Sequence, residues 1–200
     1  MSTRRLAVAT LLTGVIAGLV GLACIHLLHW IQAIAWDMHS GTLLNAVSAV
    51  SPSRRVGVLT LAGVVGALSW FLLFRRNKAV TSVSAAVGGT PMPPLRATWH
   101  ALTQVLIVGL GASVGREVAP REMAAAFSAV AADRLGLTPE DRRIIVACGA
   151  GAGLAAVYSI PLSGAIYTLE ILLVSRSGRA VAPAFLTSGL AVLVSTGFTR

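Results

Sequence analysis

A carboxylate at the end of an apolar, glycine-rich stretch is the feature of this sequence best suited to chemistry. Residues 101–115 carry no charged side chain, and Arg116 and Glu117 follow them side by side. A carboxylate next to a lipid-embedded segment is costly unless it faces water or an ion path. Pro120 suits the first turn of a helix, where its missing N–H costs nothing. We therefore expect Glu117 to lie beside the N-terminus of a helix that begins near Val118, where backbone N–H groups attract anions.

The composition indicates a protein embedded in a membrane. Apolar residues make up 56% of the chain and charged residues only 12%, whereas soluble domains carry about 25% charged residues. The net charge of +9 comes largely from short arginine clusters between apolar runs, which is the pattern of loops beside transmembrane helices. Because no aromatic and basic platform for nucleic acid is found, we expect no nucleic-acid partner.

The apolar runs predict an all-α fold, a polytopic membrane protein with tilted, short and re-entrant helices in one transmembrane domain, residues 1–200. A crossing needs about 20 apolar residues, more when the helix is tilted. Runs of sufficient length predict spanning helices at residues 6–35, 56–74, 99–115 and 180–198.

Shorter apolar segments predict helices that stop inside the membrane. Residues 79–87 are too short to cross and precede a Gly-Gly-Thr-Pro break, so we expect them to enter and return. Pro161 divides another long run into expected helices at 142–157 and 161–174. Backbone that is not helical at this depth must face protein or a cavity. Broken helices whose N-termini point inward are how transporters bind anions, which favours an anion-transport protein.

The remaining reactive side chains predict neither a metal site nor an enzyme. Cys24 and Cys148 lie inside apolar runs and are best interpreted as small buried residues. His26 and His29 share a helical face, but no carboxylate is spaced to join them as a metal ligand. No serine has a suitably spaced histidine base, so we expect no catalytic residues and no cofactor.

Two motifs resemble the CLC family of chloride channels and transporters. Residues 115–120 read GREVAP, which is similar to the GREGP signature of that family. Residues 148–170 read CGAGAGLAAVYSIPLSGAIYTLE and resemble the family's segment between this signature and its proton-pathway glutamates. The resemblance extends loosely from Leu6 to the end of the chain.

The resemblance implies that Glu117 is a gate for chloride or another small anion. In the family this glutamate competes with anions at a helix N-terminus, so Gly115, Arg116, Glu117 and Val118 are the implied anion-binding residues. It also implies a multi-pass protein of the cell membrane that acts as a homodimer. The alternative is that Glu117 simply forms an ion pair with Arg116 or Arg121.

Departures from the family pattern leave the transport mode open. Lys78 stands where the family has the serine of its inner anion site, and either binds anions there or is an ordinary basic loop residue. Glu170 matches the first proton-pathway glutamate, but Ile171 replaces the second. Because isoleucine carries no proton, we predict passive transport resembling a voltage-gated chloride channel, with a proton-coupled antiporter as the alternative.

The length of the chain raises a third possibility. The resemblance covers the first of two inverted repeats in family members, so the chain is interpreted either as a fragment or as a half that must pair. A truncated, non-conducting half-protein is therefore the remaining hypothesis. The sequence does not distinguish chloride from other anions.

Overall fold

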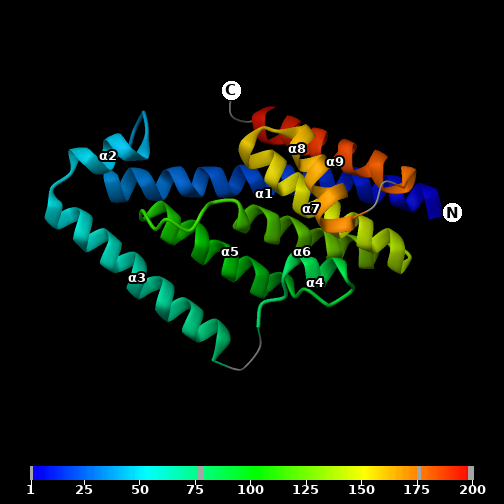
Figure 1. Ribbon diagram of the computed structural model, residues 1–200, viewed down its shortest axis with the longest axis horizontal. Helices are drawn as coiled ribbons and strands as arrows, with labels where there is room; N and C mark the ends of the chain where they lie inside the picture. The colour runs from blue at the N-terminus through cyan, green and yellow to red at the C-terminus, as the bar shows by residue number, and fades with distance from the viewer. Residues whose placement is uncertain (1, 76–78, 175–176, 198–200) are drawn as a thin grey trace.

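The computed structural model describes residues 2–75, 79–174 and 177–197, and over these residues every regular element is a helix. The predicted all-α fold is confirmed. Figure 1 shows α1 running along much of the molecule, with α6 to α9 packed at its N-terminal half and α3 splayed away from its C-terminal end.

Three described helices are long and apolar enough to cross a membrane. They are α1 (Ser2–Trp36), α3 (Pro52–Phe74) and α9 (Gly178–Gly197). The helix α3 begins four residues before its predicted start, because the Ser51 side chain accepts a hydrogen bond from the N–H of Arg54 and Pro52 fits the first turn. Most of α3 is exposed, which suits a helix surrounded by lipid.

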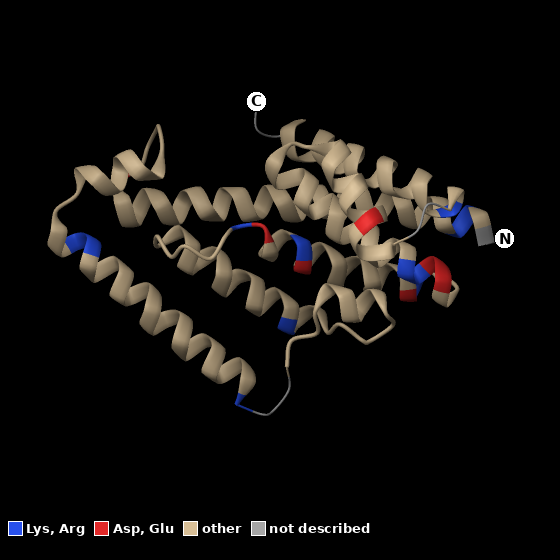
Figure 2. Cartoon of the chain, viewed as in Figure 1, with Lys and Arg blue, Asp and Glu red and all other residues tan. Residues whose placement is uncertain are grey.

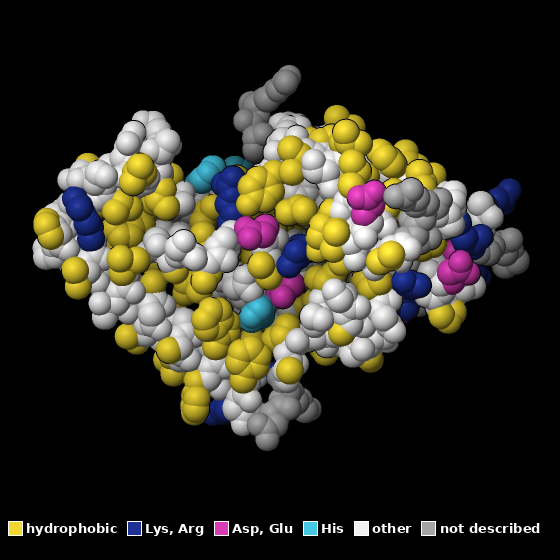
Figure 3. Space-filling model, viewed as in Figure 1, with side chains coloured by type: hydrophobic (Ala, Val, Ile, Leu, Met, Phe, Trp, Pro, Cys, Tyr) yellow, Lys and Arg dark blue, Asp and Glu magenta, His cyan; other side chains and the backbone are white. Residues whose placement is uncertain are grey.

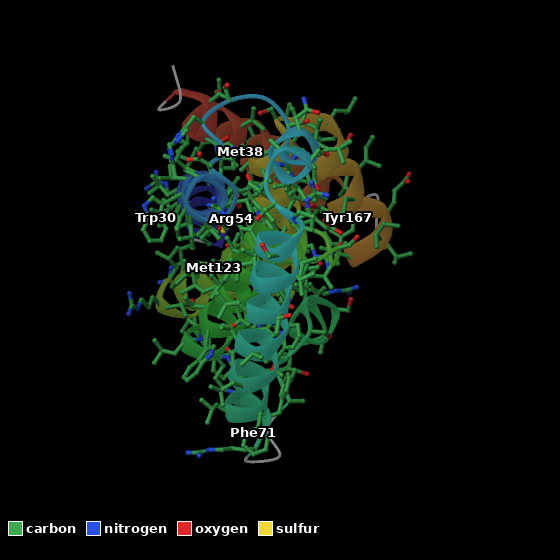
Figure 4. The ribbon with its side chains drawn as sticks, turned by 90° about the vertical axis from the view of Figure 1, so that its left-hand side faces the viewer. Trp30, Met38, Arg54, Phe71, Met123 and Tyr167 are labelled. Atoms are coloured by element: carbon green, nitrogen blue, oxygen red, sulfur yellow. The ribbon has the colours of Figure 1, made fainter. Side chains whose placement is uncertain are left out.

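An arginine pair joins α3 to the helices before it. Arg54 donates from Nε to the carbonyl of Ala35 at 3.0 Å and from Nη2 to that of Ile34 at 3.1 Å. These carbonyls belong to the last turn of α1 and have no partner within the helix. Arg55 similarly donates to the carbonyls of Ser48 and Val50 at the end of α2 (Leu43–Ala49). Figure 4, in which α1 is seen nearly end-on, shows Arg54 beside the end of that helix.

The centre of the fold is the pair α6 (Val118–Arg134) and α7 (Pro139–Tyr158). Glycines of α7 let the two helices approach closely: a Cβ at Gly153 would lie 2.5 Å from the Pro120 carbonyl oxygen, and one at Gly149 would overlap Ser128. Small residues at such interfaces are typical of membrane helices. The Thr138 side chain caps α7, accepting a hydrogen bond from the N–H of Asp141.

The predicted crossing at residues 99–115 is wrong. The helix α5 (Pro94–Gly109) begins earlier, because Pro94 occupies its first turn, and ends earlier, because Gly111 adopts a left-handed backbone with φ +96°. Its 16 residues span about 24 Å, less than the roughly 30 Å of a hydrocarbon core.

The short helices occur in the order that the sequence predicts, with different bounds. The helix α4 (Val83–Val87) covers only the end of the predicted 79–87 segment, since the Ser82 side chain caps it. The helix α8 (Pro161–Ile166) starts at the predicted break and continues as the π-helix η1 (Tyr167–Leu173). The break follows from Ser159, whose left-handed φ of +56° ends α7.

Candidate functional site

The loop of residues 110–117 joins the end of α5 to the start of α6 near the middle of the molecule. Figure 2 shows a basic and an acidic segment side by side just before α6. The indole Nε1 of Trp36, a residue only 1% exposed, donates to the carbonyl of Gly109 at 3.0 Å and so holds the end of α5 against α1. The loop is therefore anchored where it leaves α5.

Glycine is required at position 115 for two reasons. Its φ is +79°, a left-handed conformation that other residues adopt at a cost. A Cβ at this position would also overlap the carboxylate of Glu117, which folds back over the loop. Gly115 therefore makes the space in which the Glu117 side chain lies.

Glu117 occupies the N-cap position of α6 but does not cap the helix with its side chain. Its half-buried carboxylate instead accepts a hydrogen bond from the hydroxyl of Tyr158, with Oη 3.4 Å from Oε2. The guanidinium of Arg116 lies over the same tyrosine ring, 4.9 Å from its centroid, as a cation–π contact. Tyr158 thus contacts both charged residues of the predicted gate.

The described residues do not form the alternative arrangement, an ion pair between Glu117 and an arginine. Arg116 is stacked on Tyr158, and Arg121 donates from Nη1 to the hydroxyl of Tyr167 at 3.0 Å. Neither guanidinium forms an ion pair with the Glu117 carboxylate in the described part of the chain. The side chain is consequently held by a single, long hydrogen bond.

The first turn of α6 supplies the positive end of a helix dipole beside this carboxylate. Val118 is the first helical residue and Pro120 follows in the same turn. N–H groups in a first turn lack partners within the helix, and they favour a negative charge. The arrangement offers Glu117 and a small anion the same local positive field.

Of the remaining predicted site residues, the structure describes Glu170 but not Lys78. Lys78 falls outside the described residues; beyond it, residues 79–81 line a cavity of about 140 Å³ together with residues 91–93, Arg96 and Ala97. Glu170 lies in η1 and is exposed, and Ile171 beside it is 65% exposed. The described contacts of Tyr158 are those with Glu117 and Arg116.

The sequence interpretation missed two features of this region. It did not single out Tyr158, whose hydroxyl reaches Glu117. It also did not consider His100 and Glu122 together, whose imidazole and carboxylate lie 2.6 Å apart. A carboxylate within an alanine-rich apolar helix was the available signal, because such a group requires a buried partner.

The fold and the site together define a polytopic helical membrane protein in which short helices begin inside the bundle. The family model described as voltage gated chloride channel matches residues 62–200. The chain therefore belongs to this family, which confirms the resemblance to the CLC proteins.

Individual relatives agree with this assignment. The chain is 29% identical over 198 residues to the voltage-gated ClC-type chloride channel ClcB of Escherichia coli O139:H28 (strain E24377A / ETEC), covering 96% of this chain and 47% of the relative. The ClcB protein of Shigella boydii serotype 18 (strain CDC 3083-94 / BS512) gives the same values. The chain thus spans about half the length of these curated relatives.

A solved structure has the same fold. The X-ray crystal structure of a slow cyanobacterial Cl⁻/H⁺ antiporter superposes with a TM-score of 0.78 at 21% sequence identity. The match covers 98% of this chain and 47% of the antiporter chain. At this identity the likeness establishes the fold.

Proposed function

We propose that this protein conducts chloride passively across the cell membrane and that the Glu117 carboxylate gates the path. The observation that carries the proposal is the half-buried carboxylate at the start of α6, held by the Tyr158 hydroxyl and paired with neither Arg116 nor Arg121. A carboxylate under so light a restraint is able to leave when an anion takes its place.

The competition has a physical basis. The start of α6 is favourable for one negative charge, and a second charge close by is repelled. Gly115 leaves room for the carboxylate, and Arg116 adds a positive charge on the same side of Tyr158. We propose that an anion binds against Gly115, Arg116 and Val118 once Glu117 has moved, and that Lys78 adds a further basic group along the path.

Proton-coupled exchange is the second candidate function. Glu170 is retained in η1 as a carboxylate that could hold a proton. Ile171 cannot hold one, and for this reason we favour passive conduction. The two mechanisms differ in whether an anion gradient moves protons.

The experiment is anion efflux from liposomes that contain the native protein, with internal pH recorded in the same sample. We expect Glu117→Gln to change chloride efflux about tenfold, because a charge at a helix N-terminus is worth roughly 1 kcal/mol or more and tenfold corresponds to about 1.4 kcal/mol. Glu140→Gln, at an exposed carboxylate in the first turn of α7, is the matched control.

Each other outcome selects a different hypothesis. Proton movement driven by a chloride gradient would select the antiporter. Equal efflux from wild type and Glu117→Gln would refute the gate. No efflux from folded protein would select a non-conducting protein.

The assembly is also proposed. The family resemblance favours a homodimer in the cell membrane, and large apolar side chains exposed on the last helices, such as Leu186 at 59% and Leu193 at 69%, suit contact with lipid or another subunit. Cross-linking in native membranes, followed by mass measurement, would distinguish a dimer from a monomer.

A further inference from the structure

A histidine and a glutamate form a short contact inside the helix bundle, apart from the 110–117 loop. Nδ1 of His100, on α5, lies 2.6 Å from Oε2 of Glu122, on α6. Their side chains are only 16% and 10% exposed. In Figure 3, acidic, basic and histidine side chains gather near the centre of the face in view, between apolar surfaces.

The surroundings of the pair are largely aromatic. The rings of Trp70 and Phe74, both on α3, lie 6.2 Å and 6.4 Å from the His100 ring. Gln104, one turn further along α5, places Nε2 3.1 Å from Nδ1 of His100. Three helices thus enclose the pair and limit its contact with water.

The chemistry of the pair suits a bound proton. Histidine is the side chain whose charge changes near neutral pH. When two ionisable groups lie this close, protons bind to the pair rather than to either residue alone. With one proton the pair has no net charge, and when that proton leaves it carries one negative charge that few polar neighbours can offset.

A purely structural role explains the pair less well. A buried ion pair is often no more stable than apolar packing in the same space, because both groups lose their hydration. The neighbouring helix positions already pack with apolar residues, as the buried Ala97 and Met123 illustrate.

Several of the other ionisable groups on the packed helices form contacts elsewhere. Arg96 donates to the carbonyl of Leu73, Arg121 to Tyr167, and Tyr158 to Glu117. The helix α4 has no ionisable side chain. Those remaining on α1, α3, α6 and α7 are Arg4, Arg5, Cys24, His26, His29, Arg54, Arg55, Asp133, Arg134, Glu140, Asp141, Arg142, Arg143 and Cys148.

The pair is close to the gate along a single helix. Glu122 follows Glu117 by five residues, which corresponds to about 7.5 Å of rise along α6. Charges on neighbouring turns of a helix inside a protein interact more strongly than they do in water. A negative pair would repel both the Glu117 carboxylate and an anion beside it.

We propose that the His100–Glu122 pair is a proton-binding site whose occupancy controls anion movement past Glu117. The control rests on the proposed function of Glu117, whereas proton binding stands without it. Uptake of one proton by the negative pair removes its charge, and release of that proton restores it.

Proton binding is measured first, without transport. Nitrogen-15 NMR of the native protein in detergent, with labelled histidine, follows the His100 ring across the pH range in which the protein stays folded. His100→Gln assigns the signal. We expect the ring signal to change with pH and Glu122→Gln to move the midpoint of that change. The exposed His29→Gln serves as control and should leave the midpoint unchanged. A ring that never titrates, or an equal midpoint in Glu122→Gln, overturns proton binding.

Control of transport is measured next, in liposomes. The ratio of chloride efflux at about pH 5 to that at about pH 8, the range over which histidine changes charge, is compared among wild type, Glu122→Gln and His29→Gln. We expect this ratio to approach one in Glu122→Gln and to stay at the wild-type value in His29→Gln. A wild-type ratio in correctly folded Glu122→Gln overturns the proposal that the pair controls transport. Efflux insensitive to Glu117→Gln instead refutes the proposed function, and the NMR result then still decides on proton binding.

Discussion

The hydroxyl of Tyr158 lies 3.4 Å from Oε2 of Glu117, so the last residue of α7 donates a hydrogen bond to the carboxylate at the start of α6. The same ring carries the guanidinium of Arg116 on its face. Two separate contacts therefore converge on Tyr158, and a substitution can remove one while keeping the other.

Tyr158→Phe should increase anion efflux about fivefold. It removes the hydroxyl that holds Glu117 but keeps the ring under Arg116, and a typical hydrogen bond is worth about 1 kcal/mol. Liposome efflux provides the measurement. Tyr167→Phe, which removes the hydroxyl that accepts from Arg121, is the matched control and should leave efflux within about twofold of wild type.

Gly115→Ala should destabilise the loop and displace the Glu117 carboxylate. Alanine would adopt an unfavourable φ of +79° and overlap that carboxylate, at a cost of about 1–2 kcal/mol for the backbone alone. Thermal unfolding in detergent measures the loss. Gly57→Ala, in open space on α3, should be neutral or slightly stabilising; equal melting temperatures for the two variants would contradict the assigned role of Gly115.

Gly153→Val should prevent close packing of α6 against α7. Even the first carbon of the new side chain would lie 2.5 Å from the Pro120 carbonyl oxygen, and overpacking typically costs about 1–3 kcal/mol or more. Size-exclusion chromatography after extraction should find little folded protein. Gly189→Val, where nothing lies within 4 Å, should yield the wild-type amount of folded protein.

Arg54→Ala should lower the melting temperature by freeing the end of α1. The variant loses hydrogen bonds to the carbonyls of Ala35 and Ile34, each worth about 0.5–1.5 kcal/mol. Arg4→Ala, at an exposed position near the start of α1, is the control for loss of positive charge. An equal loss in both variants would mean that charge, rather than these contacts, stabilises the protein.

Much of the helical pattern follows from the sequence, because apolar length and strong breakers are local properties. The break at Pro161 lies where it was expected. The end of α5 was misplaced because residues 110–115 are as apolar as the helix before them, so hydropathy does not mark the left-handed turn at Gly111.

The position of Glu117 beside a helix start could also be predicted, from Pro120 and the run that follows it. The hydrogen-bond partner of Glu117 could not be predicted, because Tyr158 is far away in the sequence. It reaches Glu117 only through the packing of α6 on α7. The same reason hid the His100–Glu122 pair, which depends on the rotation of α5 relative to α6.

The hydrogen bond from Trp36 to the carbonyl of Gly109 anchors the 110–117 loop at the opposite end from Tyr158. One of these contacts is made by α1 and the other by α7, so the loop is held between two helices. A change in the tilt of α1, such as a thinner or thicker bilayer imposes, would therefore move one end of the loop relative to the other. The position of the Glu117 carboxylate would then depend on the thickness of the membrane.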